Sequence, residues 1–470
     1  MVTFLLLFYL FRGVAWLMRL LFAGRYATLQ RDSQQYFEKR VHKAEEEGRR
    51  VRVLLIGGTG AVGQNIAKRL LSAYFSRPCE VYLCGRKSSR CAAVVEQLVA
   101  EGFDPKLLHY VVLDLHHGKE AIVEAMKNMD LVVHSASPFQ NAPPVVLEAA
   151  IASKIDYIDV CGDIEFCKRC VKLKAGAQRA RIKAITAGGV FPGLANVMGA
   201  ELVEAFAAKG KKVKSLEFNY FVAGTGGLGP TPITTTLLVA SRPNLTMRDG
   251  KEHWVPYFSH PKNVDFGKPV GVRGCGFYEQ TEVYSMHRSY RVLNVCSRFG
   301  MAPGMFRSFL YWLSRSAPAS WLANLRFNHI VMTSISPLMD IVDLFTGRTL
   351  AIAVTAKSKT SVTETGKTKT NGTRKKKKRR GRKTDEAKAT GDAQDNVTSL
   401  SEEGAEMAES RYIHSNGVVA TATCVVAMIE EMLAEEGGIG PGVWFPEEAI
   451  QRKARFIERT TVDAINFSRL

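Results

Sequence analysis

The sequence predicts an α/β protein in which a doubly wound parallel sheet precedes a second, α+β domain. An apolar segment at residues 50–56 runs directly into closely spaced glycines and then into an amphipathic helical pattern, as at the start of a βαβ unit. Short apolar segments then alternate with helical stretches as far as residue 187, which favours a parallel sheet. Beyond about residue 200 the strand-like segments become longer and polar-edged, which is typical of an α+β domain.

The predicted strands of the first domain are short and rich in Val, Leu and Ile. Parallel strands have this composition because helices cover both faces of their sheet. After residues 50–56 they lie at residues 80–86, 108–115, 130–135, 156–160 and 183–187. Ile66, Leu70 and Leu71 give the first helix an apolar face that we expect to pack on this sheet.

The glycines that follow the first strand have the spacing of a phosphate-binding loop. Gly58, Gly60 and Gly63 fit G-x-G-x-x-G, and Gly57 with the last two fits the G-x-x-G-x-x-G variant. Glycines here let bare backbone approach a pyrophosphate at the positive end of the next helix. The alternative is a tight turn that needs glycine only for steric reasons. Because the flanking strand and helix complete a βαβ unit, we predict a dinucleotide site made by Gly57, Gly58, Thr59, Gly60, Ala61, Val62 and Gly63.

The end of the second strand indicates which dinucleotide binds. An Asp or Glu at this point would accept a hydrogen bond from the ribose 2′-hydroxyl of NAD. The strand instead ends on Arg86, with Lys87 and Arg90 close behind. A guanidinium would neutralise the 2′-phosphate of NADP, so NADP is the predicted cofactor. The alternative is a solvated basic turn.

Two more strand ends are predicted to line the cofactor site. Asp114 ends the third strand, where an adenine edge would pass. Ser135 and Ala136 end the fourth strand, where small side chains leave room for the nicotinamide ribose. Packing alone would also account for each of these residues.

Charge and cysteine content exclude several functional classes. Part of the net charge of +19 lies in one basic run at residues 374–383, so the charge alone does not indicate a nucleic-acid-binding face. That run is either a solvated loop or a contact for anionic lipid, RNA or an import receptor, and we expect no sequence-specific nucleic-acid binding. The nine cysteines form no disulfide framework. Cys167 and Cys170 form a C-x-x-C without a second pair or a neighbouring histidine, so no metal site is predicted.

The N-terminal residues 1–24 are strongly apolar but contain Arg12 and Arg19. A spacing of seven places both arginines on one face of a helix. The apolar residues favour insertion about as much as the two arginines oppose it. Crossing a membrane and lying in its interface are therefore close in energy. We expect this segment to hold the protein at a membrane, with the catalytic domain facing the cytosol. Targeting to an organelle, a chloroplast or a mitochondrion, is the alternative.

Changes in composition along the chain predict its domain organisation. The predicted segments are a membrane-associating or targeting helix in 1–30, a nucleotide-binding domain at 50–200, an α+β substrate domain at 201–356 and 410–435, an insertion at 357–409, and a C-terminal segment at 436–470 that returns to the first domain. The insertion is poor in apolar residues and has a basic and an acidic half, so we expect it to be disordered. Aromatic-rich helices at residues 305–313 and 321–327 are expected in the core or in a homodimer contact.

Taken in chain order, these motifs resemble the saccharopine dehydrogenase-like oxidoreductases, a family with relatives of carboxynorspermidine synthase. The resemblance covers most of residues 50–460, and it is carried by residues 57–63, 84–86, 130–139, 156–163, 188–196 and 442–447. It implies an NAD(P)-binding Rossmann domain that closes against an α+β domain, with the last segment returning to the first. It also implies hydride transfer to or from a small metabolite.

Two positions depart from the family pattern. Phe191 stands where the saccharopine enzymes have an acid before Pro-Gly in the G-x-x-P-G turn, and Phe139 stands where a tyrosine is expected after the fourth strand. Both departures remove polar groups that would handle substrate, which argues against saccharopine. The alternative function is therefore a non-catalytic nucleotide-binding scaffold or redox sensor.

The polar residues left near the expected cleft are the candidates for protonating a substrate. Asp163 follows the fifth strand, on the side where ligands bind in such sheets. Asn196 lies just after the G-x-x-P-G turn. Both are predicted as catalytic residues, with His134 and Asp159 as further candidates. Capping of the following helices is an equally good interpretation of Asp163 and Asn196.

Overall fold

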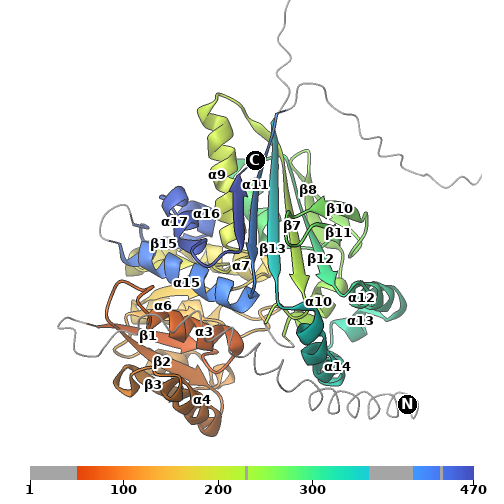
Figure 1. Ribbon diagram of the computed structural model, residues 1–470. Helices are drawn as coiled ribbons and strands as arrows, with labels where there is room; N and C mark the ends of the chain where they lie inside the picture. The colour runs from red at the N-terminus through yellow and green to blue at the C-terminus, as the bar shows by residue number, and fades with distance from the viewer. Residues whose placement is uncertain (1–49, 228–230, 359–405, 435–437, 470) are drawn as a thin grey trace, which may run out of the picture.

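The computed structural model describes residues 50–227, 231–358, 406–434 and 438–469 (Figure 1). Our predictions for residues 1–30, and for the insertion between residues 359 and 405, lie outside this part. Among the described residues, no helix combines the length and the apolar character needed to cross a membrane.

The first domain is built on a sheet of seven parallel strands. Their order across the sheet is β3-β2-β1-β4-β5-β6-β15, and every neighbouring pair is parallel. The strands are β1 (Val51–Ile56), β2 (Cys79–Gly85), β3 (Leu108–Val112), β4 (Leu131–His134), β5 (Asp156–Asp159), β6 (Lys183–Ile185) and β15 (Gly442–Trp444). The chain order reverses between β1 and β4, which is the switch point where ligands bind in such sheets. The predicted doubly wound sheet is confirmed.

Helices cover both faces of this sheet, as the alternation of side chains in β1 shows. Val53 and Leu55 face α3 (Ala61–Leu70) and α4 (Ser88–Ala100), whereas Leu54 and Ile56 face the opposite layer. That layer contains α5 (Lys119–Ala125), α6 (Val145–Ser153), α7 (Ile164–Lys172) and α8 (Lys174–Ala180). Two 3₁₀ turns, η1 (Pro105–Leu107) and η2 (Leu115–His117), flank β3.

The second domain contains a mixed sheet of nine strands. The path β10-β11-β12-β7-β13-β14-β16 is antiparallel except between β12 and β7, and β8 and β9 branch from β12. The strands are β7 (Val213–Ala223), β8 (Asn244–Arg248), β9 (Lys251–Val255), β10 (Lys262–Asp265), β11 (Val272–Phe277), β12 (Asn294–Ala302), β13 (Leu350–Ser358), β14 (Met407–His414) and β16 (Asn466–Arg469). Because β13 and β14 are paired over their length, the two ends of the 357–409 segment belong to strands.

One group of helices lies between the two sheets and joins the domains. It comprises α9 (Leu194–Ala208), α11 (Thr281–Tyr290), α15 (Gly417–Leu433), α16 (Pro446–Ala449) and α17 (Lys453–Thr460). The apolar helix α15 is buried along its length and packs on α3. One hydrophobic core therefore runs from the first sheet through α15 to the second.

A second group of helices lies at the far end of the mixed sheet (Figure 1). It comprises α10 (Thr231–Ala240), α12 (Gly304–Ser316), α13 (Ala319–Leu322) and α14 (Leu325–Thr346). These four helices share a small core of their own, made by Ile233, Leu237, Leu310, Leu322 and Val331.

The C-terminal segment contributes to both domains. After α15 the chain adds β15 to the edge of the first sheet, parallel to β6. It then forms α16 and α17 and ends in β16, which pairs with β14 of the second sheet. Of the predicted returning segment, only the part around β15 belongs to the first sheet.

Candidate active site

The glycine loop between β1 and α3 is shaped by close backbone contacts. Gly57 has a φ of +84°, and a Cβ there would lie 2.8 Å from the backbone nitrogen of Ala136. A Cβ on Gly63 would lie 2.5 Å from the carbonyl oxygen of Gly57 and 2.6 Å from the Cα of Gly58. These glycines are therefore required by the fold of the loop itself.

Gly60 has more room for a side chain than Gly57 or Gly63. It is the N-cap of α3, its φ is −84°, and the nearest atom to a Cβ would be the Gly57 oxygen at 3.2 Å. The first turn of α3 has neither a side-chain cap nor an acidic residue. The N–H groups of this turn thus lack the partner that a capping side chain would give them. A bare, uncapped helix start of this kind fits the pyrophosphate of a dinucleotide.

The basic residues predicted to select the cofactor lie beside this loop. Arg86 directly follows β2, is exposed, and forms no hydrogen bond or ion pair with the other described residues. The Arg90 guanidinium donates a long hydrogen bond, 3.5 Å, to the carbonyl oxygen of Thr59. Thr59 in turn packs against Gly85, the last residue of β2. A phosphate between the loop and the end of β2 would therefore meet an available guanidinium.

The remaining predicted cofactor residues lie at the same edge of the sheet. The Asp114 carboxylate caps η2 by accepting a hydrogen bond from the His116 backbone N–H at 3.0 Å. This hydrogen bond lowers the pKa of Asp114. The Ser135 hydroxyl donates to the carbonyl oxygen of Ile56 at 3.0 Å. The backbone of Ala136 packs against Gly57.

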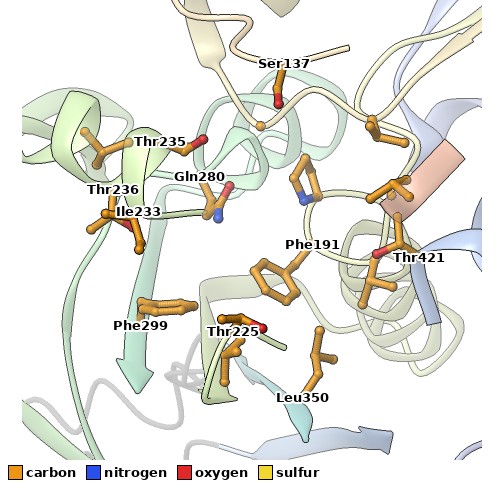
Figure 2. A pocket seen from close by; sticks show the side chains of 18 of the residues that line it. Ser137, Phe191, Thr225, Ile233, Thr235, Thr236, Gln280, Phe299, Leu350 and Thr421 are labelled. Atoms are coloured by element: carbon orange, nitrogen blue, oxygen red, sulfur yellow. The ribbon is translucent and has the colours of Figure 1, made fainter. Parts of the chain in front are cut away.

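A single cavity of about 310 Å³ joins the glycine loop to the second domain. From the first domain it is lined by loop and turn residues, among them Gly57, Gly60, Ala61, Val62, Gly63, Ser135 and Ser137. From the second domain it is lined mostly by apolar side chains and threonines, among them Ile233, Thr235, Thr236, Phe299, Met301 and Leu350. Figure 2 shows these labelled side chains converging from both domains.

The polar side chains of the cavity are hydroxyls and amides, with one exception. Gln280 lines the cavity from the second domain (Figure 2). Its amide has no hydrogen-bond partner among the described residues. The exception is Glu279, a carboxylate that is paired with an arginine. The described lining residues include no Lys, Arg or His.

Comparison with known proteins agrees with this geometry. Residues 53–190 match the family model described as the saccharopine dehydrogenase NADP binding domain. This likeness is confined to the first domain. The match includes the glycine loop, Arg86 and the strands up to β6. The cofactor predicted from the sequence is thereby confirmed as NADP, as is the resemblance to this family. The comparison with curated proteins gives no significant match.

Two solved structures share the arrangement of both domains. One is the apo form of saccharopine dehydrogenase (L-Glu forming) from Saccharomyces cerevisiae, at 12% identity and a TM-score of 0.54, covering 89% of this chain and 100% of that one. The other is homospermidine synthase from Legionella pneumophila in complex with NAD, at 10% identity and a TM-score of 0.55, covering 90% and 91%. At such identities the likeness concerns the fold alone.

Phe191 and Phe139, the two departures from the saccharopine pattern, form apolar walls of the cavity. The Phe191 ring stacks on Tyr220, with centroids 4.7 Å apart and an interplanar angle of 19°. Phe139 packs edge-on against His134 at 4.8 Å and Phe166 at 5.1 Å. Both rings are held by aromatic neighbours, so this part of the NADP-binding domain presents carbon surface to a substrate.

Asp163 connects the NADP-binding domain to the second domain. One carboxylate oxygen accepts from the Phe166 backbone N–H at 2.8 Å and caps α7, and the other accepts from Arg242 at 2.8 Å. Arg242 also donates to Glu279 at 2.8 Å, and Glu279 accepts from the Leu245 N–H at 3.0 Å. Burial raises the pKa of Glu279. With both oxygens engaged, Asp163 is placed as a positioning residue, and its catalytic role stays a prediction.

Asn196 is fully buried at the start of α9. Its side-chain oxygen accepts from the Gly193 backbone N–H at 2.8 Å. Its amide nitrogen donates to the Ser285 hydroxyl at 3.0 Å and to Glu447 at 2.9 Å. These bonds join α9 to α11 and α16, and Asn196 does not line the cavity. A catalytic role for Asn196 stays a prediction that this placement does not favour.

The other polar candidates lie beneath the ends of β4 and β5. Burial lowers the pKa of His134 to about 4, so its ring is neutral at pH 7. Asp159 accepts hydrogen bonds from the Tyr157 hydroxyl and from two backbone N–H groups, all at 2.9 Å. Cys167 and Cys170 are buried, and the described residues contain no group of three His, Cys, Asp or Glu side chains arranged to hold a metal.

Sequence reasoning missed the residues that bring polar groups into the cavity from the second domain. Tyr278, Glu279 and Gln280 lie in the short connection between β11 and α11, and no motif marks this connection. Arg242 follows α10 and pairs with residues 37 and 79 positions away. Only the packing of the two domains brings these groups together, so a single sequence carries no signal for them.

Proposed function

We propose that this protein is an NADP-dependent oxidoreductase that transfers hydride to or from a small, largely apolar metabolite. The observation that carries the proposal is the single cavity shared by the glycine loop and the apolar side chains of the second domain. When bound, NADP supplies or accepts the hydride. The residues of the chain bind the cofactor at the loop, exclude water with Phe191, Phe299 and Leu350, and orient the substrate.

The lining of the cavity supports a neutral substrate. A substrate with free carboxylates would need cationic partners, and the described lining offers none. Arg242 is close by, but Asp163 and Glu279 already engage its guanidinium. We therefore propose a substrate with a carbonyl, imine, hydroxyl or activated double bond on an apolar skeleton.

Gln280 is proposed to bind the polar group of the substrate. Changing Gln280→Leu keeps the size of the side chain and removes its hydrogen-bonding groups, so kcat/KM is expected to fall about tenfold. The Kd for NADPH should remain unchanged. Steady-state kinetics and a fluorescence titration with NADPH measure the two quantities. Gln97→Leu on the exposed face of α4 is the matched control, and an equal loss in both variants would contradict the assignment.

Arg86 is proposed to make the protein prefer NADP over NAD. Changing Arg86→Asp removes the charge that would pair with the 2′-phosphate and introduces repulsion, so the ratio of NADPH to NADH affinity should fall about 100-fold. Fluorescence titrations with both cofactors measure this ratio. Arg179→Asp places the same change on another exposed arginine of the first domain and should leave the ratio unaltered. An unchanged ratio in the Arg86 variant would end this assignment.

A non-catalytic nucleotide-binding protein is the second candidate. Two observations favour it: the phenylalanines at positions 139 and 191, and the engagement of Asp163 and Asn196 in structural hydrogen bonds. Such a protein would bind NADPH without oxidising it in the presence of any metabolite. Tight NADPH binding without turnover in a broad metabolite screen would therefore favour this function.

We also propose that residues 1–24 hold the protein at a membrane with its two domains in the cytosol. The support is the apolar composition of the segment and the arginines around it. Import into a chloroplast or mitochondrion is the alternative. Fractionation of cells that express the full chain, followed by carbonate extraction, distinguishes membrane anchoring from import. Recovery in the soluble cytosol would exclude both.

A further inference from the structure

The helices α12, α13 and α14 form an exposed apolar surface, most of which lies outside the cavity of the proposed function. We call these helices, residues 304–346, the helical cap. Large side chains of the helical cap are turned to solvent, among them Met305, Phe309, Tyr311, Trp312, Trp321, Leu325 and Ile330. The exposed fractions of Met305, Trp312 and Trp321 are 74%, 61% and 58%. Such a concentration of exposed apolar side chains marks an interaction site in a soluble domain.

The exposure of these side chains is a consequence of how the helical cap packs. Leu310 and Leu322 face inward to the small core shared with α10, and Asn324 begins α14 by accepting hydrogen bonds from two backbone N–H groups. Trp312 and Trp321 remain exposed on the same helices. The sequence had suggested core or dimer contacts for these aromatic helices, and their tryptophans are not in the core.

The charge of the helical cap indicates what covers it. The helical cap contains Arg307, Arg315 and Arg326, and its acidic residues, Asp340 and Asp343, lie in the last two turns of α14. Arg315 and Arg326 are exposed and form no ion pair with a described residue. The Arg315 guanidinium lies over the Tyr311 ring, 5.3 Å from its centroid. Exposed Trp and Tyr with unpaired arginines are the side chains that favour a membrane–water interface with anionic lipid.

We propose that the helical cap docks on an anionic lipid surface, inserting Trp312 and Trp321 among the headgroups. A second copy of the chain fits less well, because a symmetric contact would bring the exposed arginines of one cap against those of the other. Docking would also place α12 at the lipid, and Phe309 and Leu310 of α12 line the cavity. The proposal does not depend on the proposed function and involves none of residues 1–24.

Lipid-attached quenchers test this docking on the full chain. The protein is mixed with vesicles of phosphatidylcholine and phosphatidylserine that carry a nitroxide near the headgroup, and its tryptophan emission is recorded. Because Trp16 lies in the apolar segment 1–24, all variants are made in a Trp16→Phe protein, which serves as the unchanged reference. We expect strong quenching in this reference and loss of most of it when Trp312→Phe/Trp321→Phe is added. The control Trp254→Phe removes an exposed tryptophan on β9 and should leave the quenching intact. Equal quenching in the double variant and the reference would overturn the proposal.

The lipid charge and the alternative partner are tested separately. Arg315→Gln/Arg326→Gln should weaken binding to phosphatidylserine-containing vesicles about 30-fold at low salt, with little change for phosphatidylcholine alone. Equal affinity of this variant and the unchanged protein for both vesicles would contradict the role of charge. Sedimentation velocity without lipid tests for a dimer. A dimer that Trp312→Ser/Trp321→Ser converts to a monomer would show that a second copy of the chain, and not lipid, covers the helical cap.

Discussion

Replacing Gly60→Val is expected to weaken NADPH binding at least about 100-fold while leaving the fold intact. A Cβ at this position has one close neighbour, at 3.2 Å, and the backbone φ of −84° suits any residue. The valine side chain would occupy the space at the start of α3 where the pyrophosphate must approach. A loss of two orders of magnitude corresponds to about 2.7 kcal/mol of binding free energy.

Two other glycines make the Gly60 experiment specific. Gly440→Val introduces the same side chain at an exposed glycine with open space around it and should change neither stability nor NADPH affinity. Gly63→Ala places a Cβ 2.5 Å from a carbonyl oxygen, so it should lower the free energy of unfolding as well as NADPH affinity. Fluorescence titration and urea unfolding separate the two effects. Normal NADPH affinity in Gly60→Val would show that the phosphates bind elsewhere.

The stability of the protein is expected to depend on the protonation of Glu282. This side chain is fully buried, and one carboxyl oxygen accepts from the Tyr220 hydroxyl at 2.6 Å while the other has no partner among the described residues. Burial raises the pKa of Glu282 from 4.5 to about 7. A pKa raised by folding means that the folded state favours the protonated carboxyl. Its stabilising effect is fully present below the pKa of the unfolded chain and is lost as pH rises through about 7.

The variant Glu282→Gln should remove this pH dependence. Glutamine stays neutral and its carbonyl still accepts from Tyr220. Its free energy of unfolding relative to the unchanged protein should therefore rise by about 3 kcal/mol between pH 4 and pH 8. Urea unfolding across this range measures the difference. Glu165→Gln, on the exposed side of α7, is the control for the substitution itself. A difference for Glu282→Gln that is constant with pH would contradict its raised pKa.

Glu282 also bears on the shape of the cavity. Tyr220, which donates to Glu282, is the ring on which Phe191 stacks. Ionising the carboxylate would strengthen its hydrogen bond to Tyr220 but leave a charge in a low-dielectric site. Phe191 therefore stacks on a tyrosine whose hydrogen-bond partner, Glu282, changes its charge near neutral pH.

The first domain was predictable from sequence because its signals are local. A buried parallel strand is recognisable as a short apolar run. The glycine loop occupies seven consecutive residues between such a run and a helix. The β15 strand shows the limit of local signals, because its three residues pair with β6, and every strand of the second sheet except β16 lies between the two in the chain. The second sheet was predictable as a class but not in its order, since β12 and β7 pair in parallel across 79 residues.

The site was predictable only where it is made of consecutive residues. The loop and Arg86 lie in one βαβ unit, so their proximity follows from the fold. Gln280 and Arg242 reach the cavity through contacts between domains, and nothing in their own neighbourhood marks them. Asp163 was found because it follows a strand, but the partner that engages its second oxygen lies 79 residues away.

Oxidation of NADPH by the purified full chain shows whether the protein is an NADP-dependent oxidoreductase. The protein is incubated with NADPH and either the polar or the apolar fraction of a metabolite extract, while absorbance at the nicotinamide band is followed. We expect steady oxidation with the apolar fraction, little with the polar fraction, and none with Gly60→Val. Tight NADPH binding with no oxidation in either fraction would contradict the proposed oxidoreductase activity and favour a non-catalytic nucleotide-binding protein.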